Sequence, residues 1–177
     1  MEIGHAAEMY LLLTDGALWQ FTDGGMPESL SALTERYARL ARRSSPTGDE
    51  HWLNWIARDL ASGNAVGFVQ ASVSRGDSTA RIAYVIGRRY WGLGFAGDSV
   101  RLMIDELENN HSVTRLVACV DCRNCGSTAL LRRLGMQCVD ELDPQNNQYL
   151  GEIVNEPQSI GQASWPSICR LGKDSSR

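Results

Sequence analysis

The chain has 177 residues, of which 43% are hydrophobic, so it can bury a substantial core within a single domain. Its net charge of −4 argues against a general nucleic-acid-binding protein, and no apolar run approaches the ~18 residues of a membrane span. Residues 1–5 lack the basic and apolar regions of a signal peptide, and five cysteines are an odd number in a chain too large to need disulfides. We therefore expect a cytoplasmic protein with reduced thiols and neither a membrane nor a nucleic-acid partner.

The first half of the chain predicts two helices followed by three strands. The spacing of apolar residues predicts a helix over 6–13, closed by Gly16, and a second helix that starts at Pro27 and Glu28 and runs to about residue 41. Apolar and aromatic runs then predict strands at 51–59, 65–74 and 79–86, separated by turn-forming residues at 61–64 and 75–78. This order predicts an antiparallel meander.

The second half predicts a helix over 95–109, a buried strand at 116–120, and a helix capped by Asn124 or Ser127 that ends before Gly135. Residues 136–140 and 148–154 predict a final antiparallel pair. The fold class is therefore α+β, with a mixed, mostly antiparallel sheet flanked by helices. Residues 1–154 form the expected domain, and 155–177 form an irregular tail in which Trp165 and Ile168 are the residues that would dock on the domain.

The segment 82–97 carries the strongest functional signal. An apolar strand leads into a basic loop with paired glycines, and a helix follows at once. Gly92 and Gly94 allow a ligand to approach backbone N–H groups, while the helix N-terminus, Arg88 and Arg89 supply positive potential. The segment predicts a cradle for a phosphate or pyrophosphate.

One reading of this cradle is a dinucleotide-binding loop. Gly92-x-Gly94-x-x-Gly97 fits that motif, and Asp121 follows the next strand where a ribose ligand is expected. Against it, residues 88–91 separate the strand from the first glycine, the motif lies mid-chain, and only 56 of the 177 residues follow Asp121.

The second reading rests on two motifs in order. Arg89-x-x-Gly92-x-Gly94 resembles the acyl-CoA pyrophosphate loop of the GCN5-related N-acetyltransferase (GNAT) superfamily, and residues 90–96 look most like the branch that acetylates ribosomal-protein N-termini. Asn124-x-x-Ser127, followed by the Leu-Leu-Arg-Arg-Leu-Gly-Met run of 130–136, resembles a second segment of that family. The two motifs together cover about residues 80–140 and favour this reading.

The resemblance implies transfer of an acetyl group from acetyl-CoA to a primary amine, either a peptide N-terminus or a small molecule. It also implies a first strand before the first helix, which we expect here to be absent or supplied by another segment. The cofactor-binding residues that it implies are Tyr84, Val85, Ile86, Arg89, Tyr90, Trp91, Gly92, Leu93, Gly94, Phe95, Asn124 and Ser127. A non-catalytic acyl-CoA-binding protein on the same fold is the alternative, and a homodimer is left open.

The catalytic residues do not transfer simply from the resemblance. Cys119 and Leu131 stand where one branch of the family has its Glu and Tyr. Asp121 is the nearest carboxylate, either as a base or as a solvated loop residue, and Ser127 is a proton donor to the leaving thiolate or only a cap residue. Glu8 and His51 are weaker candidates.

A metal site is not expected. Cys122-x-x-Cys125 has ligand spacing but no second pair, and Cys119 and Cys138 lie in predicted strands.

Overall fold

A computed structural model of the protein describes residues 1–22, 24–141, 146–153 and 168–172. Its helices are α1 (Ala6–Leu13), α2 (Leu30–Leu40), α3 (Phe95–His111) and α4 (Cys125–Arg133), with short 3₁₀ turns at Ile3–His5, Gly16–Trp19 and Arg88–Tyr90. Its strands are β1 (Glu50–Asp59), β2 (Ala65–Ser74), β3 (Thr79–Ile86), β4 (Arg115–Asp121), β5 (Gln137–Glu141), β6 (Asn146–Glu152) and β7 (Cys169–Leu171). No helix among these residues combines the length and apolarity that a bilayer crossing requires.

The strands form one seven-stranded sheet in the order β5-β6-β4-β3-β2-β1-β7. Only β3 and β4 run parallel, and every other neighbouring pair is antiparallel. The mixed, mostly antiparallel sheet predicted from the sequence is therefore confirmed, as are the meander of β1, β2 and β3 and the antiparallel pair of β5 and β6.

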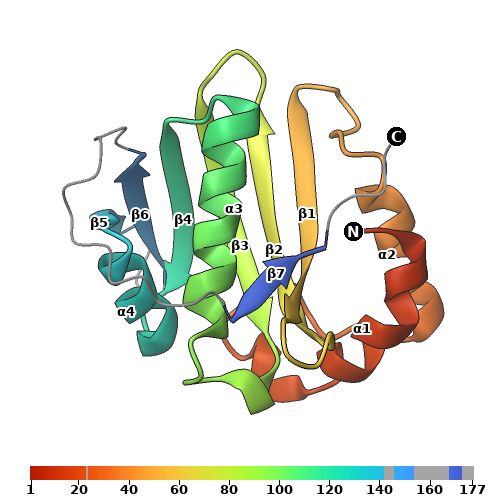
Figure 1. The fold of residues 1–177 in the computed structure, drawn as a ribbon. Coiled ribbons are helices and arrows are strands. Elements are labelled where there is room, and N and C mark those ends of the chain that lie inside the picture. Colours follow the sequence, from red (N-terminus) through yellow and green to blue (C-terminus); the bar gives the residue numbers. More distant parts are fainter. Residues whose placement is uncertain (23, 142–145, 154–167, 173–177) are drawn as a thin grey trace.

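Helices cover both faces of this sheet (Figure 1). Alternation along β1 places Trp55 in the core on the α3 and α4 side and its neighbour Ile56 in the core on the α1 and α2 side. Val100, Met103 and Leu107 of α3 are fully buried against the first of these cores. The two apolar layers hold the sheet rigid, and the loops at the carboxyl ends of β3 and β4 are built on that support.

Two helix boundaries differ from the expectation. The helix predicted from Pro27 begins only at Leu30, because the Ser29 hydroxyl caps it by accepting the Ala32 N–H at 3.1 Å. Gly16, expected only to end the first helix, opens a further 3₁₀ turn.

The largest difference lies in the C-terminal part of the chain. Residues 169–171 form β7, which pairs antiparallel with the outer edge of β1, so the expectation of an irregular tail is wrong for them. The edge strand beside β1 thus comes from the C-terminal part of the described chain, and residues 168–172 belong with the domain predicted for 1–154. Ile168 does pack on the body as expected, whereas Trp165 lies outside the described residues.

Candidate functional site

The sheet opens between its two parallel strands. β3 and β4 are in register only from Thr79–Arg115 to Arg81–Val117, although β3 continues to Ile86 and β4 to Asp121. Their carboxyl ends therefore diverge at the same edge of the sheet, where ligands commonly bind in α/β folds.

Backbone groups of β3 face this gap. The Gly87 N–H donates to Val66 O at 2.8 Å, so Gly87 and every second residue before it face β2. Tyr84 and Ile86 alternate with these residues and direct their backbone groups away from β2, toward the gap. The Trp91 indole N–H donates to Ile86 O at 2.6 Å, whereas Tyr84 has no β4 residue in register with it. This geometry suits an extended ligand that pairs with β3 through Tyr84 and the Ile86 N–H, whereas the backbone of Val85, which was expected to share this role, is paired with β2.

The loop between β3 and α3 depends on its glycines. Gly92 and Gly94 have φ angles of +74° and +91°, in the left-handed region that L side chains rarely adopt. Gly94 is also the N-cap of the 17-residue helix α3, and no side chain caps that helix end. The helix therefore presents its N–H groups and the positive end of its dipole at the loop, next to β3.

Two of the amides that we expected in the cradle are already engaged. The Tyr90 N–H donates to Gly87 O at 2.8 Å and the Trp91 N–H to Arg88 O at 3.1 Å, which closes the 3₁₀ turn. No described residue accepts a hydrogen bond from the amides of residues 92–97. The Tyr90 and Trp91 amides are therefore not available for the cradle predicted from Tyr90 to Phe95, and the amides of residues 92–95 remain predicted to form it.

Positive charge and aromatic packing surround this loop. Arg88 and Arg89 are exposed, and neither forms an ion pair with a described residue. The Arg89 guanidinium lies 4.6 Å from the centre of the Tyr90 ring, and that ring meets Phe95 edge to face at 5.4 Å. These contacts anchor the loop while leaving cationic groups beside the amides.

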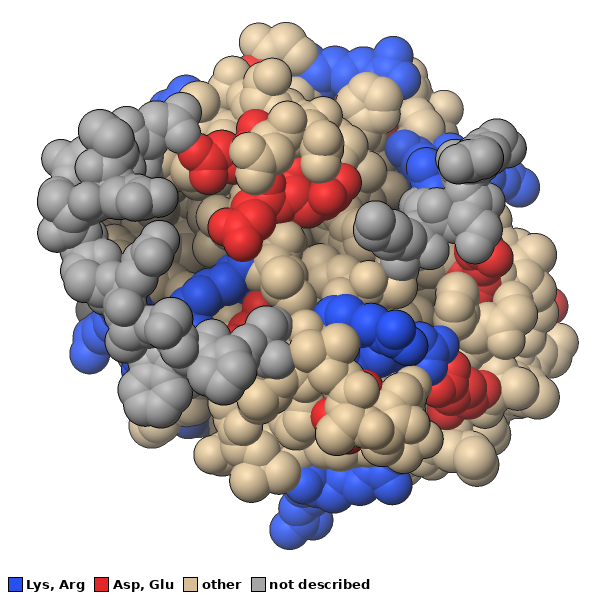
Figure 2. Space-filling model, viewed as in Figure 1, with Lys and Arg blue, Asp and Glu red and all other residues tan. Residues whose placement is uncertain are grey.

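Most acidic residues of α3 lie away from this loop, and Asp98 in its first turn is the exception. Figure 2 shows acidic side chains gathered over the half of α3 remote from this loop, the half that contains Asp105, Glu106 and Glu108. The separation keeps most of the negative charge of α3 away from an anion held at its N-terminus.

Across the gap, α4 presents its own N-terminus. The Asn124 side-chain oxygen accepts the Ser127 N–H at 3.1 Å, so Asn124 is the cap and Ser127 lies in the first turn. The Tyr84 hydroxyl from β3 is buried and has no hydrogen-bond partner among the described residues. Burial raises the pKa of Tyr84, and the neighbouring Ser127 hydroxyl opposes this rise.

Asp121 lies at the end of β4 in a tight ion pair. Arg123 donates from Nε and Nη2 to the two carboxylate oxygens at 2.9 and 2.6 Å, and its backbone N–H donates at 2.9 Å. These hydrogen bonds lower the pKa of Asp121 to about 2. The Arg123 guanidinium also lies 5.8 Å from the centre of the Phe21 ring, which brings the α1–α2 connection to the mouth of the gap. A carboxylate this acidic is a poor proton acceptor, which favours the second of the two roles predicted for Asp121, that of a loop carboxylate, over the role of base.

The weaker catalytic candidates are placed in structural roles. Glu8 joins α1 to β1 through two bonds to Arg58, at 2.6 and 2.8 Å, and also accepts the Ala65 N–H. The Arg58 partner lowers the pKa of Glu8. His51 lies opposite Val73, at the end of the sheet far from the loop that follows β3. Leu131, which stands at the family's Tyr position, is fully buried in the core.

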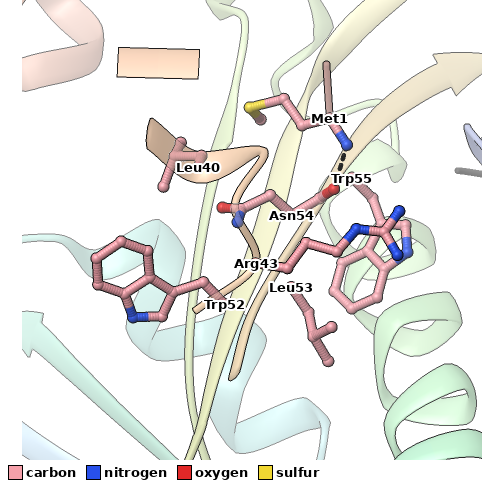
Figure 3. Close-up of a pocket in the computed structure, with 7 residues that line it drawn as sticks. All are labelled: Met1, Leu40, Arg43, Trp52, Leu53, Asn54 and Trp55. Carbon is pink, nitrogen blue, oxygen red and sulfur yellow. Dashed lines mark hydrogen bonds between the residues drawn. The ribbon is translucent and has the colours of Figure 1, made fainter. Parts of the chain in front are cut away.

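No group of three or more His, Cys, Asp or Glu residues suited to a metal ion occurs in the described ranges. A hollow lies among residues of β1 and the end of α2 (Figure 3). The Met1 amine closes one side of it by donating to Asn54 O at 2.7 Å. None of the loop or α4 residues described above lines this hollow.

The residues around the gap fit acyl-CoA. The helix N-terminus shaped by glycines has amides without an acceptor among the described residues, and Arg88 and Arg89 have no described ion-pair partner, which suits a pyrophosphate. The Tyr84 backbone groups and the Ile86 N–H, which β3 does not pair with β4, suit an extended arm that carries amide groups.

Comparisons with known proteins agree with this geometry. Over 65 residues the chain is 34% identical to an uncharacterized N-acetyltransferase, p20, of Bacillus licheniformis, covering 37% of this chain and 36% of that protein. Over 85 residues it is 28% identical to the uncharacterized protein YkkB of Bacillus subtilis, covering 46% of this chain and 49% of that protein. The matches thus span half or less of these curated relatives.

The fold is shared with solved acetyltransferases. It superposes with a TM-score of 0.69 on an aminoglycoside acetyltransferase, AAC(6′)-Ib, in complex with coenzyme A, at 18% identity over 86% of this chain and 92% of that one. It superposes with a TM-score of 0.70 on spermidine N-acetyltransferase from Vibrio cholerae in complex with CoA and spermine, at 15% identity over 86% of this chain and 92% of that one. The TM-score is also 0.70 for a ribosomal-protein-S5-alanine acetyltransferase from Vibrio fischeri, at 14% identity over 89% of this chain and 93% of that one.

A family model described as acetyltransferase (GNAT) domain matches residues 1–137. This range includes the meander, the loop between β3 and α3, and both ends of the gap. The protein therefore belongs to the GNAT acetyltransferase family.

Proposed function

We propose that the protein moves an acetyl group from acetyl-CoA directly to a primary amine. The observation that carries the proposal is the gap between β3 and β4, with the free amides of residues 92–97 at one end and the Asn124-capped helix at the other. Acetyl-CoA supplies the activated acyl thioester. The loop amides, Arg88 and Arg89 bind its pyrophosphate, and the backbone groups of Tyr84 and Ile86 that face the gap align its arm.

The reaction needs a neutral amine and a proton for the leaving thiolate. We assign the proton donor to the Ser127 hydroxyl, because it lies in the first turn of α4, beside the Tyr84 hydroxyl of β3. Asp121 has a pKa of about 2, so it accepts a hydrogen bond or orients the amine instead of removing its proton. Holding the two substrates together then supplies much of the rate.

We propose a primary amine as the acceptor and do not narrow it to one substrate. The relatives above act, by their names, on an aminoglycoside, a polyamine and a protein alanine, so the shared fold allows several amines. Residues 90–96 resemble the loop of the branch that acetylates ribosomal-protein N-termini, which favours a peptide N-terminus as the first acceptor to test. The cytoplasmic location and a homodimer remain predictions.

The first experiment separates ligand classes. Thermal unfolding is measured with acetyl-CoA, with CoA and with NAD, since a ligand of the native state raises stability. We expect acetyl-CoA and CoA, but not NAD, to raise the melting temperature by several degrees. Stabilisation by NAD alone would instead support the dinucleotide-binding alternative.

Turnover then separates an enzyme from a binding protein. Thiol release is followed with peptides that have free N-termini, with polyamines and with aminoglycosides. We expect at least one class to be acetylated. Tight CoA binding without turnover on any amine would favour the non-catalytic alternative.

Replacing Asp121 with asparagine should lower kcat/KM about tenfold, or about 1.4 kcal/mol, and leave acetyl-CoA affinity unchanged. The effect is modest because the hydrogen bonds from Arg123 lower the pKa of Asp121 to about 2, so Asp121 does not remove the proton of the amine. The stability that this pair contributes is complete above about pH 4 and is lost as the pH falls through the folded-state pKa. The pH–rate profile between pH 5 and 9 should therefore follow the acceptor amine and move upward when an α-amine is exchanged for a lysine-type amine.

Asp49→Asn is the matched control, since Asp49 also has a lowered pKa but lies at the far end of the sheet, before β1. A loss of kcat of a thousandfold in Asp121→Asn, with CoA binding intact, would make Asp121 the essential base.

A further inference from the structure

We propose that β7 is a positioning element for the phosphate-binding loop, and that docking of β7 and binding of acetyl-CoA are coupled through Asp98. This inference rests on the proposed function, because it assigns the bound anion to the loop that β7 supports. It goes beyond that function by giving the C-terminal strand a role in substrate affinity.

The first step is how β7 is held on the sheet. Its register with β1 runs from Ala57–Leu171 to Asp59–Cys169. Two further backbone bonds bracket the strand, from Leu60 N–H to Ile168 O at 3.1 Å and from Gly172 N–H to Ile56 O at 2.9 Å. The attachment is regular but short, and such short edge elements open at low free energy compared with the core of a domain.

The second step is that β7, together with Ile168 just before it, contacts the first turns of α3 and the loop at Gly94. The Ile168 N–H donates to Asp98 Oδ2 at 2.6 Å, across 70 residues of sequence, and Cys169 Sγ lies 3.4 Å from Ser99 Oγ. The Ile168 side chain reaches to within 3.4 Å of where a Cβ on Gly94 would lie. The segment that begins at Ile168 therefore packs against the loop between β3 and α3 at Gly94.

The third step is a shared apolar cluster. Cys169 is 2% exposed and packs in one cluster with Ile86, at the end of β3, and with Phe95, at the start of α3. Tyr90 and Ile168 pack against the same cluster. The strand before the loop, the loop itself, the helix after it and β7 are thus one packed unit, so a change in any part is transmitted to the others.

The fourth step concerns charge. Asp98 lies in the first turn of α3, next to the amides assigned to the pyrophosphate. Its Oδ2 is held by Ile168 N–H, and its Oδ1 lies 3.7 Å from Arg101 Nη1. Docked β7 therefore keeps this carboxylate engaged and turned toward the sheet edge. When β7 detaches from β1, the loop loses the contact of Ile168 beside Gly94. The Asp98 carboxylate, which lies beside the proposed anion site, then loses its hydrogen bond from the Ile168 N–H.

Coupling of this kind is reciprocal. If docked β7 strengthens acetyl-CoA binding, then bound acetyl-CoA must stabilise docked β7 by the same factor. The amides that β7 buries, in residues 168–171, should then exchange with solvent more slowly in the complex.

The test on the unmodified protein is hydrogen exchange with and without saturating CoA. We expect exchange at residues 168–171 to slow about tenfold, while the remote β2–β3 turn at residues 75–78 is unchanged. CoA binding with unaltered exchange at 168–171 would overturn the coupling. Failure of CoA to bind at all would contradict the proposed function itself, so the two failures are distinguishable.

Variants of Asp98 give the second test. Asp98→Ala removes the acceptor for Ile168 N–H and should raise KM for acetyl-CoA about tenfold, with kcat within twofold. Asp98→Asn keeps a side-chain oxygen in place and should restore KM to within threefold of the original value. Asp105→Ala, an exposed acid in the remote half of α3, serves as control and should change neither constant. An unchanged KM in Asp98→Ala, or equal losses in the alanine and asparagine variants, would overturn the positioning role of Asp98.

Discussion

Gly94→Val should weaken acetyl-CoA binding by at least about 100-fold, or about 2.7 kcal/mol, in a protein that still folds. Gly94 has a φ of +91°, which costs an L-residue about 1–2 kcal/mol and costs a β-branched residue more. A Cβ there would already lie 3.4 Å from Ile168 Cδ1, so the loop must move to accommodate the side chain. Calorimetric titration with acetyl-CoA measures the loss, and thermal unfolding measures the fold.

Gly76→Val is a matched control for this variant. Gly76 has a φ of +84° with open space around its Cβ position, and it lies in the turn between β2 and β3 at the opposite end of the sheet. It should show a similar loss of stability with acetyl-CoA affinity unchanged. Unaltered affinity in a folded Gly94→Val protein would show that the loop does not bind the pyrophosphate.

Ser127→Ala should lower kcat about 100-fold while acetyl-CoA affinity stays within about threefold, which is the lower range for loss of a general acid. The substitution is clean because Asn124 caps α4 through the Ser127 backbone N–H, which alanine retains. Only the hydroxyl beside Tyr84 is removed. Steady-state kinetics with a fixed amine, together with direct titration of acetyl-CoA, separates the chemical step from binding.

Thr128→Val is the control for Ser127→Ala, since it removes the next hydroxyl along α4. The Thr128 hydroxyl is buried and has no partner among the described residues, so its loss should leave kcat and stability nearly unchanged. If kcat of Ser127→Ala stayed within threefold, another group must protonate the thiolate. If affinity fell as much as kcat, Ser127 would be a binding residue.

The local patterns in the sequence were sufficient for most of the elements. Apolar periodicity located the helices and strands on both sides of the loop, and the closely spaced Gly92 and Gly94 marked a turn that only glycine adopts easily. The Asn124-x-x-Ser127 spacing likewise located the start of α4. Each of these signals acts within one or two turns of chain, where backbone sterics and side-chain spacing suffice to decide the outcome.

The chemistry of the candidate site was less readable. Asp121 followed a strand as expected, but its pKa depends on Arg123 folding back onto it, which the spacing of two residues does not require. The burial of the Tyr84 hydroxyl beside Ser127 joins β3 to α4. Arg123, two positions after Asp121, was the one signal in the sequence for the lowered pKa of Asp121. No local pattern indicated that the Tyr84 hydroxyl would lie beside Ser127.

The sequence by itself determined the order and type of most helices and strands up to β6, the glycine-paired basic loop after β3 that we predict to bind phosphate, and the family resemblance. The tertiary structure alone decided where β3 and β4 separate, which loop amides stay free, and that residues 169–171 complete the edge of the sheet beside β1. A three-residue strand has no periodicity to detect, and it is stable only because partners some 70 or more residues away accept and donate its hydrogen bonds. Such long-range pairing depends on the assembled sheet, so it cannot be read from any window of the chain.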